Sequence, residues 1–213
     1  MTVSLEASDP KAAHHAARTF AELFAQSFSV QFGMRFTVEF LFVEDEHGVP
    51  QRVPKSVQVP FGATWYNLSV TRDRLRIAFD WTITADDRSR KAMLYFDHAC
   101  LLADFAWTLP PTGPHATFSY ALAFLQLFKA LVAIVGEPGV DRDYQRRAAD
   151  LGLPPDFWSS RVKPLYVIRN DEDVAHYSLQ EPEPGSFVGR FREAAEVFKE
   201  ALSAYFNTTR RGR

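Results

Sequence analysis

The sequence predicts an α+β fold, in which an N-terminal helix and a small antiparallel β-sheet precede an antiparallel four-helix bundle. The chain has 213 residues, 46% hydrophobic and 23% charged, so it can bury one large core or two small ones. Near the N-terminus and in the C-terminal half, apolar residues recur at helical intervals. In the segment between these two parts, every second residue is apolar over short stretches. This change of period predicts two domains, residues 1–85 with the sheet and residues 86–213 with the bundle.

The first predicted domain combines one helix with the sheet. Residues 9–31 are rich in Ala, Leu and Phe, and their large apolar side chains return every three or four positions, as on one face of a helix. Residues 35–43 and 66–70 are rich in residues that favour strands. In residues 74–84 the apolar members of a strict alternation are Leu75, Ile77, Phe79, Trp81 and Ile83. Alternation of this kind is typical of a half-buried strand, so an antiparallel sheet is expected within residues 35–84.

The second predicted domain consists of helices separated by clusters of Pro and Gly, which interrupt helices. The composition of residues 88–107 favours a helix, with a strand over residues 91–96 as the alternative. The other helices are expected over residues 115–135, 141–151 and 164–179, and after Ser186, which is the predicted cap of the last one. Because no isolated helix can bury an apolar stripe on its own, these helices are expected to pack as an antiparallel bundle.

Charge, cysteine content and hydropathy narrow the possible functions. The 24 basic and 26 acidic residues give a net charge of -2, so any contact with nucleic acid must be local. The single cysteine, Cys100, excludes an internal disulfide framework and a multi-cysteine zinc site. The N-terminus shows no secretion signal, and the apolar residues 120–135 are interrupted by Gln126 and Lys129 and are too short to span a bilayer. A soluble, cytoplasmic protein without a membrane partner is therefore expected.

The common catalytic motifs do not occur in the sequence. It contains no Gly-rich phosphate loop, Gly-x-Ser-x-Gly elbow, His-Glu-x-x-His helix or dinucleotide fingerprint. His14 and His15 are adjacent on a predicted helix, so their side chains point about 100° apart and suit a surface better than a metal ion. His98 and Cys100 share neither a helical face nor a sufficient set of ligands. The prediction is a protein with no metal and no cofactor.

Arg169 and His176 form the candidate catalytic pair. They are seven residues apart, two turns of the predicted helix over residues 164–179, so both are expected on the same helical face. A guanidinium can hold a phosphodiester and offset the charge that builds on it. An imidazole can exchange a proton with a ribose 2'-hydroxyl or with the leaving oxygen near neutral pH. Such a pair can cleave RNA without a metal ion.

The order Arg169, Asn170 and, six residues later, His176 resembles the Arg-polar-x(3–5)-His motif of the HEPN superfamily of small helical bundles. The resemblance covers only the C-terminal half of the chain. It implies a metal-independent endoribonuclease in which Arg169 and His176 are catalytic, Asn170 orients them, and the product carries a 2',3'-cyclic phosphate. It further implies a homodimer through the bundle whose two motifs meet in one cleft, a role in prokaryotic toxicity or antiviral defence, and control by an antitoxin or another regulatory protein.

Other interpretations stay open because of the acidic run that follows Arg169. Glu172 and Asp173 lie three and four residues after it, where either can pair with the guanidinium and repel an incoming phosphate. The motif would then be a solvated polar edge, and the chain a non-catalytic module that binds a protein or a ligand, as a sensor or accessory subunit. The 19 Phe and four Trp residues favour such a binding surface. A nucleotide-binding accessory protein is the weakest alternative, so whether the chain is an enzyme stays open.

Overall fold

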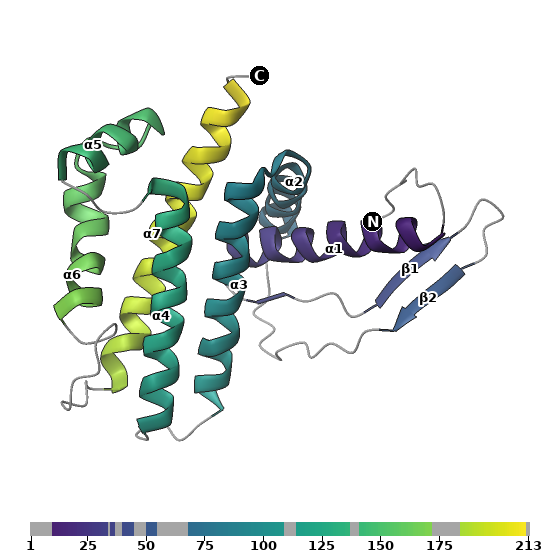
Figure 1. The fold of residues 1–213 in the computed structure, drawn as a ribbon, viewed down its shortest axis with the longest axis horizontal. Coiled ribbons are helices and arrows are strands. Elements are labelled where there is room, and N and C mark those ends of the chain that lie inside the picture. The colour runs from purple at the N-terminus through teal and green to yellow at the C-terminus, as the bar shows by residue number, and fades with distance from the viewer. Residues whose placement is uncertain are drawn as a thin grey trace. The chain divides into compact units, whose positions relative to one another are not determined.

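The described part of the chain is mainly helical. The computed structural model describes residues 10–33, 35–36, 40–44, 50–54, 68–108, 114–136, 141–171 and 184–211. In these ranges every long element is a helix (Figure 1). The chain forms two compact units, Met1–Ile83 and Thr84–Arg213.

Within its described residues, the first unit contains two helices and one pair of β-strands. The two strands pair antiparallel, with Phe42 opposite Arg52. The elements are α1 (Pro10–Phe32), β1 (Phe40–Glu44), β2 (Pro50–Pro54) and α2 (Leu68–Thr84). Two strands of five residues each are too few to form a separate layer of the fold.

Side chains from both helices form the contact between α1 and α2. The rings of Phe20 and Phe79 meet edge to face, with 6.1 Å between their centroids. The hydroxyl of Thr82 donates a hydrogen bond to the main-chain oxygen of Ala78, and it lies 3.3 Å from the hydroxyl of Ser27 in a buried position. The polar atoms on this buried contact are thereby satisfied.

The predicted α+β class is wrong, because the segment expected to supply most of the sheet is helix α2. A helix buries residues three and four apart, and in α2 the buried side chains Ala78, Trp81 and Thr82 have this spacing. Two members of the alternating apolar series, Leu75 and Ile83, are instead exposed by 39% and 58%. The inner face of α2 therefore combines Trp81 with the small residues Ala78 and Thr82, and a pattern built from large apolar residues alone missed it.

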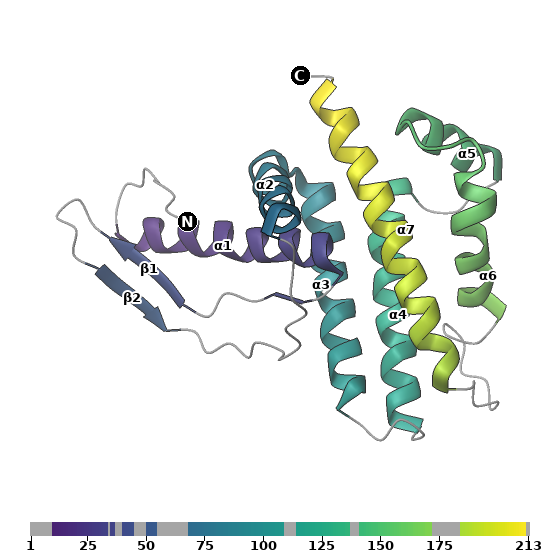
Figure 2. The ribbon, with the colours of Figure 1, turned by 180° about the vertical axis from the view of Figure 1, so that it is seen from behind.

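The second unit is a helical bundle, as predicted. Helices α3, α4 and α7 lie side by side, and α4 and α7 separate α3 from α6 in both views (Figures 1 and 2). The segment 91–96 is helical and not the alternative strand. The final helix begins two residues before the predicted cap. The elements are α3 (Asp87–Trp107), α4 (Pro114–Val135), α5 (Asp141–Asp150), the π-helix η1 (Trp158–Val162), α6 (Lys163–Asp171) and α7 (Pro184–Arg211).

Helix α4 lies at the centre of this bundle and supplies much of its core. Phe124, Leu127 and Leu131 are fully or almost fully buried. By length and composition alone, Phe118–Val135 is the one described helical segment that could cross a membrane, so the expectation that this stretch is too short is not supported. Half of the segment is buried inside the protein, which is also true of the core helix of a soluble protein.

A polar network joins the start of α3 to α7. Asp86 accepts hydrogen bonds from the main-chain N–H and the hydroxyl of Ser89, which forms a capping box, and from the hydroxyl of Tyr205. Burial raises the pKa of Asp86, but these hydrogen bonds outweigh it and hold the pKa below 3.8. Burial and the neighbouring carboxylate raise the pKa of Tyr205 to about 12. The folded state therefore favours the ionised Asp86 and the neutral Tyr205.

Tyr205→Phe is expected to lower the free energy of unfolding by about 1–2 kcal/mol at neutral pH, because it removes a hydrogen bond to a carboxylate. The contribution of Asp86 is present above pH 3.8 and is lost as the pH falls through its lowered folded pKa. The contribution of Tyr205 is present below pH 10 and is lost as the pH rises toward 12. Urea unfolding followed by circular dichroism should therefore show a deficit that shrinks in acid and in alkali.

The matched control for this measurement is Tyr95→Phe, which removes a hydroxyl from α3 outside the Asp86 network. This variant should unfold like the wild type across the same pH range. A Tyr205→Phe deficit that stays constant at every pH would contradict the linkage between Asp86 and Tyr205.

Candidate functional site

Arg169 lies in the last turn of α6 and packs against α4. Its Cζ atom is 5.2 Å from the centroid of the Phe128 ring, which is a cation–π contact. Phe128 is buried, whereas Arg169 is only half-buried. The guanidinium is therefore held at the edge of the bundle with one side on an aromatic ring.

A series of aromatic contacts connects this arginine to the neighbouring helices. The rings of Phe128 and Tyr166 are 6.1 Å apart, and those of Tyr166 and Trp158 are 6.3 Å apart, measured between centroids. Trp158 is stacked on Tyr144 of α5 at 3.6 Å. These contacts join α4, α5, η1 and α6, and they bury large aromatic areas that stabilise the position of α6. Aromatic packing therefore helps to place the backbone that carries Arg169.

The charge of Arg169 has no carboxylate partner in the part of the chain that the structure describes. Other arginines in these ranges do have such partners, as in the ion pairs of Arg18 with Glu22 and of Arg161 with Glu200. A cation–π contact uses the flat face of a guanidinium, so its in-plane N–H groups can still donate to an acceptor. Carboxylate and phosphate oxygens are the acceptors that fit this donor geometry best.

The structure describes the three predicted site residues to different extents. Arg169 is described with its side chain, and Asn170 is described as part of the α6 backbone only. His176 lies outside the described residues, as do Glu172 and Asp173 and the rest of the predicted helix up to residue 179. The shared face of Arg169 and His176 therefore stays a prediction.

The sequence analysis did not identify the aromatic residues that support Arg169. Tyr166 precedes Arg169 by three positions, which places the two residues next to each other on a helix. This spacing is the sequence feature that could have identified Tyr166 as a neighbour of Arg169. Phe128, Tyr144 and Trp158 come from three other elements, so only the folded chain shows that they belong to the same cluster.

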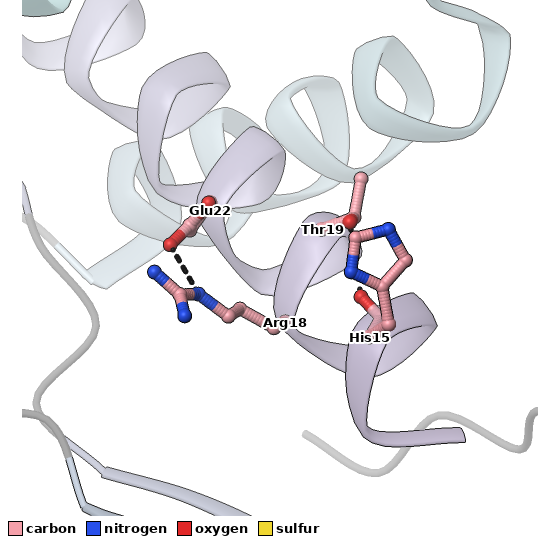
Figure 3. Close-up of polar contacts among 4 residues, drawn as sticks. All are labelled: His15, Arg18, Thr19 and Glu22. Atoms are coloured by element: carbon pink, nitrogen blue, oxygen red, sulfur yellow. Dashed lines mark hydrogen bonds and ion pairs between the residues drawn. The ribbon is translucent and has the colours of Figure 1, made fainter. Parts of the chain in front are cut away.

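His15 lies on a polar surface of α1. Figure 3 shows the guanidinium of Arg18 directed toward Glu22, with 2.9 Å between Nε and Oε1. One turn along, the hydroxyl of Thr19 donates to the main-chain oxygen of His15, whose side chain is exposed (Figure 3). Within the described ranges, no group of three or more His, Cys, Asp and Glu side chains is placed to hold a metal ion.

An open hollow of about 580 Å³ lies between α7 and the connection from α5 to η1. Arg161 and Glu200 form an ion pair at 3.6 Å there, and the hydroxyl of Thr208 donates to the main-chain oxygen of Leu151. Lys199 and Glu196 add one charge of each sign to the lining. This balance gives no net attraction for a polyanion, and Arg169 is not one of the lining residues.

Comparisons of the chain with protein-family models, with curated proteins and with solved structures give no match. The HEPN resemblance therefore depends on Arg169, Asn170 and His176 and on the order of the helices around them. Of these three residues, Arg169 is the one whose side chain the structure describes, and it lies on the ring of Phe128.

Proposed function

We propose that this protein is a metal-independent endoribonuclease of HEPN type, in which Arg169 binds the scissile phosphate and His176 moves the proton. The observation that carries the proposal is the half-buried guanidinium of Arg169, held on the ring of Phe128 without a carboxylate partner among the described side chains. A cation placed in this way is ready to accept an anion.

The proposed reaction is an attack of the ribose 2'-oxygen on the adjacent phosphorus. His176 removes the proton of the 2'-hydroxyl, and the 2'-oxygen forms a bond to phosphorus while the bond to the 5'-oxygen breaks. The departing 5'-oxygen takes up a proton from water, His176 returns its proton to the solvent, and the other fragment ends in a 2',3'-cyclic phosphate. Arg169 donates to the non-bridging oxygens and offsets their growing negative charge, and Asn170 assists in orienting the pair. No step in this sequence requires a metal ion.

RNA is the proposed substrate, and the proposed setting is prokaryotic toxicity or antiviral defence in the cytoplasm. An enzyme that cleaves RNA in its own cell has to be restrained, so an antitoxin or another regulatory protein is the proposed partner. The net charge of -2 means that the chain has no overall attraction for RNA. Binding would therefore depend on local contacts such as that of Arg169.

The test is cleavage of an end-labelled RNA by the purified protein in the presence of EDTA. The wild type should produce fragments with 2',3'-cyclic phosphate ends, and His176→Ala should reduce the rate by about 10²- to 10⁴-fold. His15→Ala, which changes an exposed histidine on α1, is the matched control and should cleave like the wild type. Equal cleavage by the wild type and His176→Ala, or no cleavage by the wild type, would end the proposal.

The second candidate is a non-catalytic protein-binding module, which a row of exposed apolar side chains on α3 favours. Leu94, Leu101 and Phe105 all face solvent, and large exposed apolar groups in a row are typical of protein contacts. Growth of an expressing host separates the two candidates. A nuclease should slow growth and Arg169→Ala should relieve the effect, whereas a binding module should be harmless in both forms.

A further inference from the structure

The hollow between α7 and the connection from α5 to η1 has the size of a small-molecule site and a lining of both charges. Its volume of about 580 Å³ lies within the range of about 300–1,000 Å³ that is usual for ligand pockets. Arg161 and Lys199 supply two positive charges, and Glu196 and Glu200 supply two negative charges. The hollow therefore presents both kinds of charge with a net charge of zero.

Two features of the structure fix the wall opposite α7. Helix α5 ends in a Schellman motif, in which the N–H of Gly152 donates to the main-chain oxygen of Ala149 and the N–H of Leu153 donates to that of Ala148. Gly152 has a φ of 70°, a left-handed conformation that glycine adopts without strain. The hydroxyl of Thr208 donates to the main-chain oxygen of Leu151 and so ties this wall to α7. The hollow thus keeps its shape without a ligand.

The ion pair of Arg161 and Glu200 is loose. The distance from Nη2 of Arg161 to Oε2 of Glu200 is 3.6 Å, longer than the roughly 2.7–3.2 Å of a hydrogen bond. The two side chains are exposed by 44% and 40%, and an exposed pair of this kind contributes little to stability. A ligand can therefore take over both charges at a small energetic cost.

The lining narrows the class of ligand. Among the described residues that line the hollow none is aromatic, so there is no face on which a nucleobase could stack. The net charge of zero gives no attraction for a polyanion or a polycation. The opposite charges of Arg161 and Glu200 are neighbours, so they match a small ligand whose own opposite charges are neighbours. An α-amino acid carries its ammonium and its carboxylate on the same carbon atom.

We propose that this hollow binds a free α-amino acid, with its carboxylate on Arg161 and its ammonium on Glu200. The planar fork of the guanidinium can donate two parallel hydrogen bonds to the ligand's carboxylate. The ammonium donates to the carboxylate of Glu200, and Glu196 lies one helical turn before Glu200 on the same face of α7. The side chain of the ligand fills the space beside Ser203. The hydroxyl of Ser203 donates to the main-chain oxygen of Lys199, so its oxygen can still accept a hydrogen bond.

This site goes beyond the proposed nuclease function and does not depend on it. Arg169 does not line the hollow. Binding of an amino acid is measured without RNA, so a failure of this proposal and a failure of the nuclease proposal are told apart.

Thermal unfolding followed by circular dichroism tests the site with each standard L-amino acid in turn. A ligand of about ten non-hydrogen atoms in an open hollow binds weakly, so we expect a Kd of about 0.1–1 mM. At about 10 mM, the bound amino acid should then raise the Tm of the wild type by about 3–10 °C. Calorimetric titration gives its Kd. If none of the amino acids raises the Tm, the proposal is wrong.

Changes to the ligand test whether the hollow holds both of its charges. The N-acetyl form of the amino acid that binds lacks the ammonium, and its amide form lacks the carboxylate. Each should bind at least about tenfold more weakly than the free amino acid, because each leaves one charged side chain of the hollow without its partner. A modified form that binds as tightly as the free amino acid would contradict the proposed contacts.

Changes to the protein test the two residues that hold the ligand. Arg161→Ala and Glu200→Gln should each raise the Kd by at least about tenfold, since each removes one of the two charges. The matched control is Arg146→Ala, because Arg146 is paired with Asp143 at the same distance of 3.6 Å and does not line the hollow. This variant should bind like the wild type. Circular dichroism should show native helix content in all three variants, and equal binding by Arg161→Ala and the wild type would overturn the site.

Discussion

Phe198→Ala is expected to lower the free energy of unfolding of the helical bundle by about 3–5 kcal/mol. Phe198 is fully buried in α7, and its ring is stacked on that of Phe96 in α3, with 5.4 Å between centroids and 19° between ring planes. Truncation removes the buried ring and leaves a cavity against Phe96, because close-packed neighbours relax only partly. The contact between α3 and α7 would thus lose the Phe96–Phe198 ring pair.

Urea unfolding followed by circular dichroism measures this loss. Phe118→Ala, on α4, is the matched control, because Phe118 is 47% exposed and its removal should cost less than about 0.5 kcal/mol. Equal midpoints for the two variants would show that the Phe96–Phe198 stack does not hold the bundle together.

The helices of the second unit could be predicted because their local signals agree with their packing. The apolar period of α4 is helical over its whole length, and Pro or Gly residues flank most of the helices. In α2 the signals conflict. Leu75 and Ile83 extend an alternating pattern that predicts a strand. Such a strand would have Ala78 and Thr82 on its solvent-facing side, but the helix buries both. Long-range contacts with α1, such as the Phe20–Phe79 ring pair, supply packing that local periodicity does not contain.

The candidate site was predictable only in part. The spacing of a motif can identify Arg169, because the residues that define it are close in sequence. The ring beneath its guanidinium belongs to Phe128, which is 41 positions earlier and on another helix. Such a contact arises from the packing of α6 against α4, and no pattern within α6 specifies it. The same holds for the stack of Trp158 on Tyr144, which fixes η1 against α5.

Arg169→Ala is expected to reduce kcat/KM for RNA cleavage by about 10²- to 10³-fold, because it removes the donor that offsets charge on the phosphate. Arg169→Lys should recover only part of this loss. A lysine keeps the positive charge, but it has neither the planar fork that grips two phosphate oxygens nor the flat face that stacks on Phe128. Initial rates with a labelled RNA in EDTA measure both variants.

Phe128→Leu tests whether the ring beneath the guanidinium matters for the same reaction. It keeps an apolar side chain in the core but removes the cation–π contact, so kcat/KM should fall by about three- to thirtyfold. In an Arg169→Ala background the same change should have little further effect, because there is no guanidinium left to position. Arg161→Ala is the control, since Arg161 pairs with Glu200 on the surface of α7 and should not affect cleavage. Equal losses from Phe128→Leu with and without Arg169 would mean that the ring only stabilises the fold, and that Arg169 reaches the phosphate without its support.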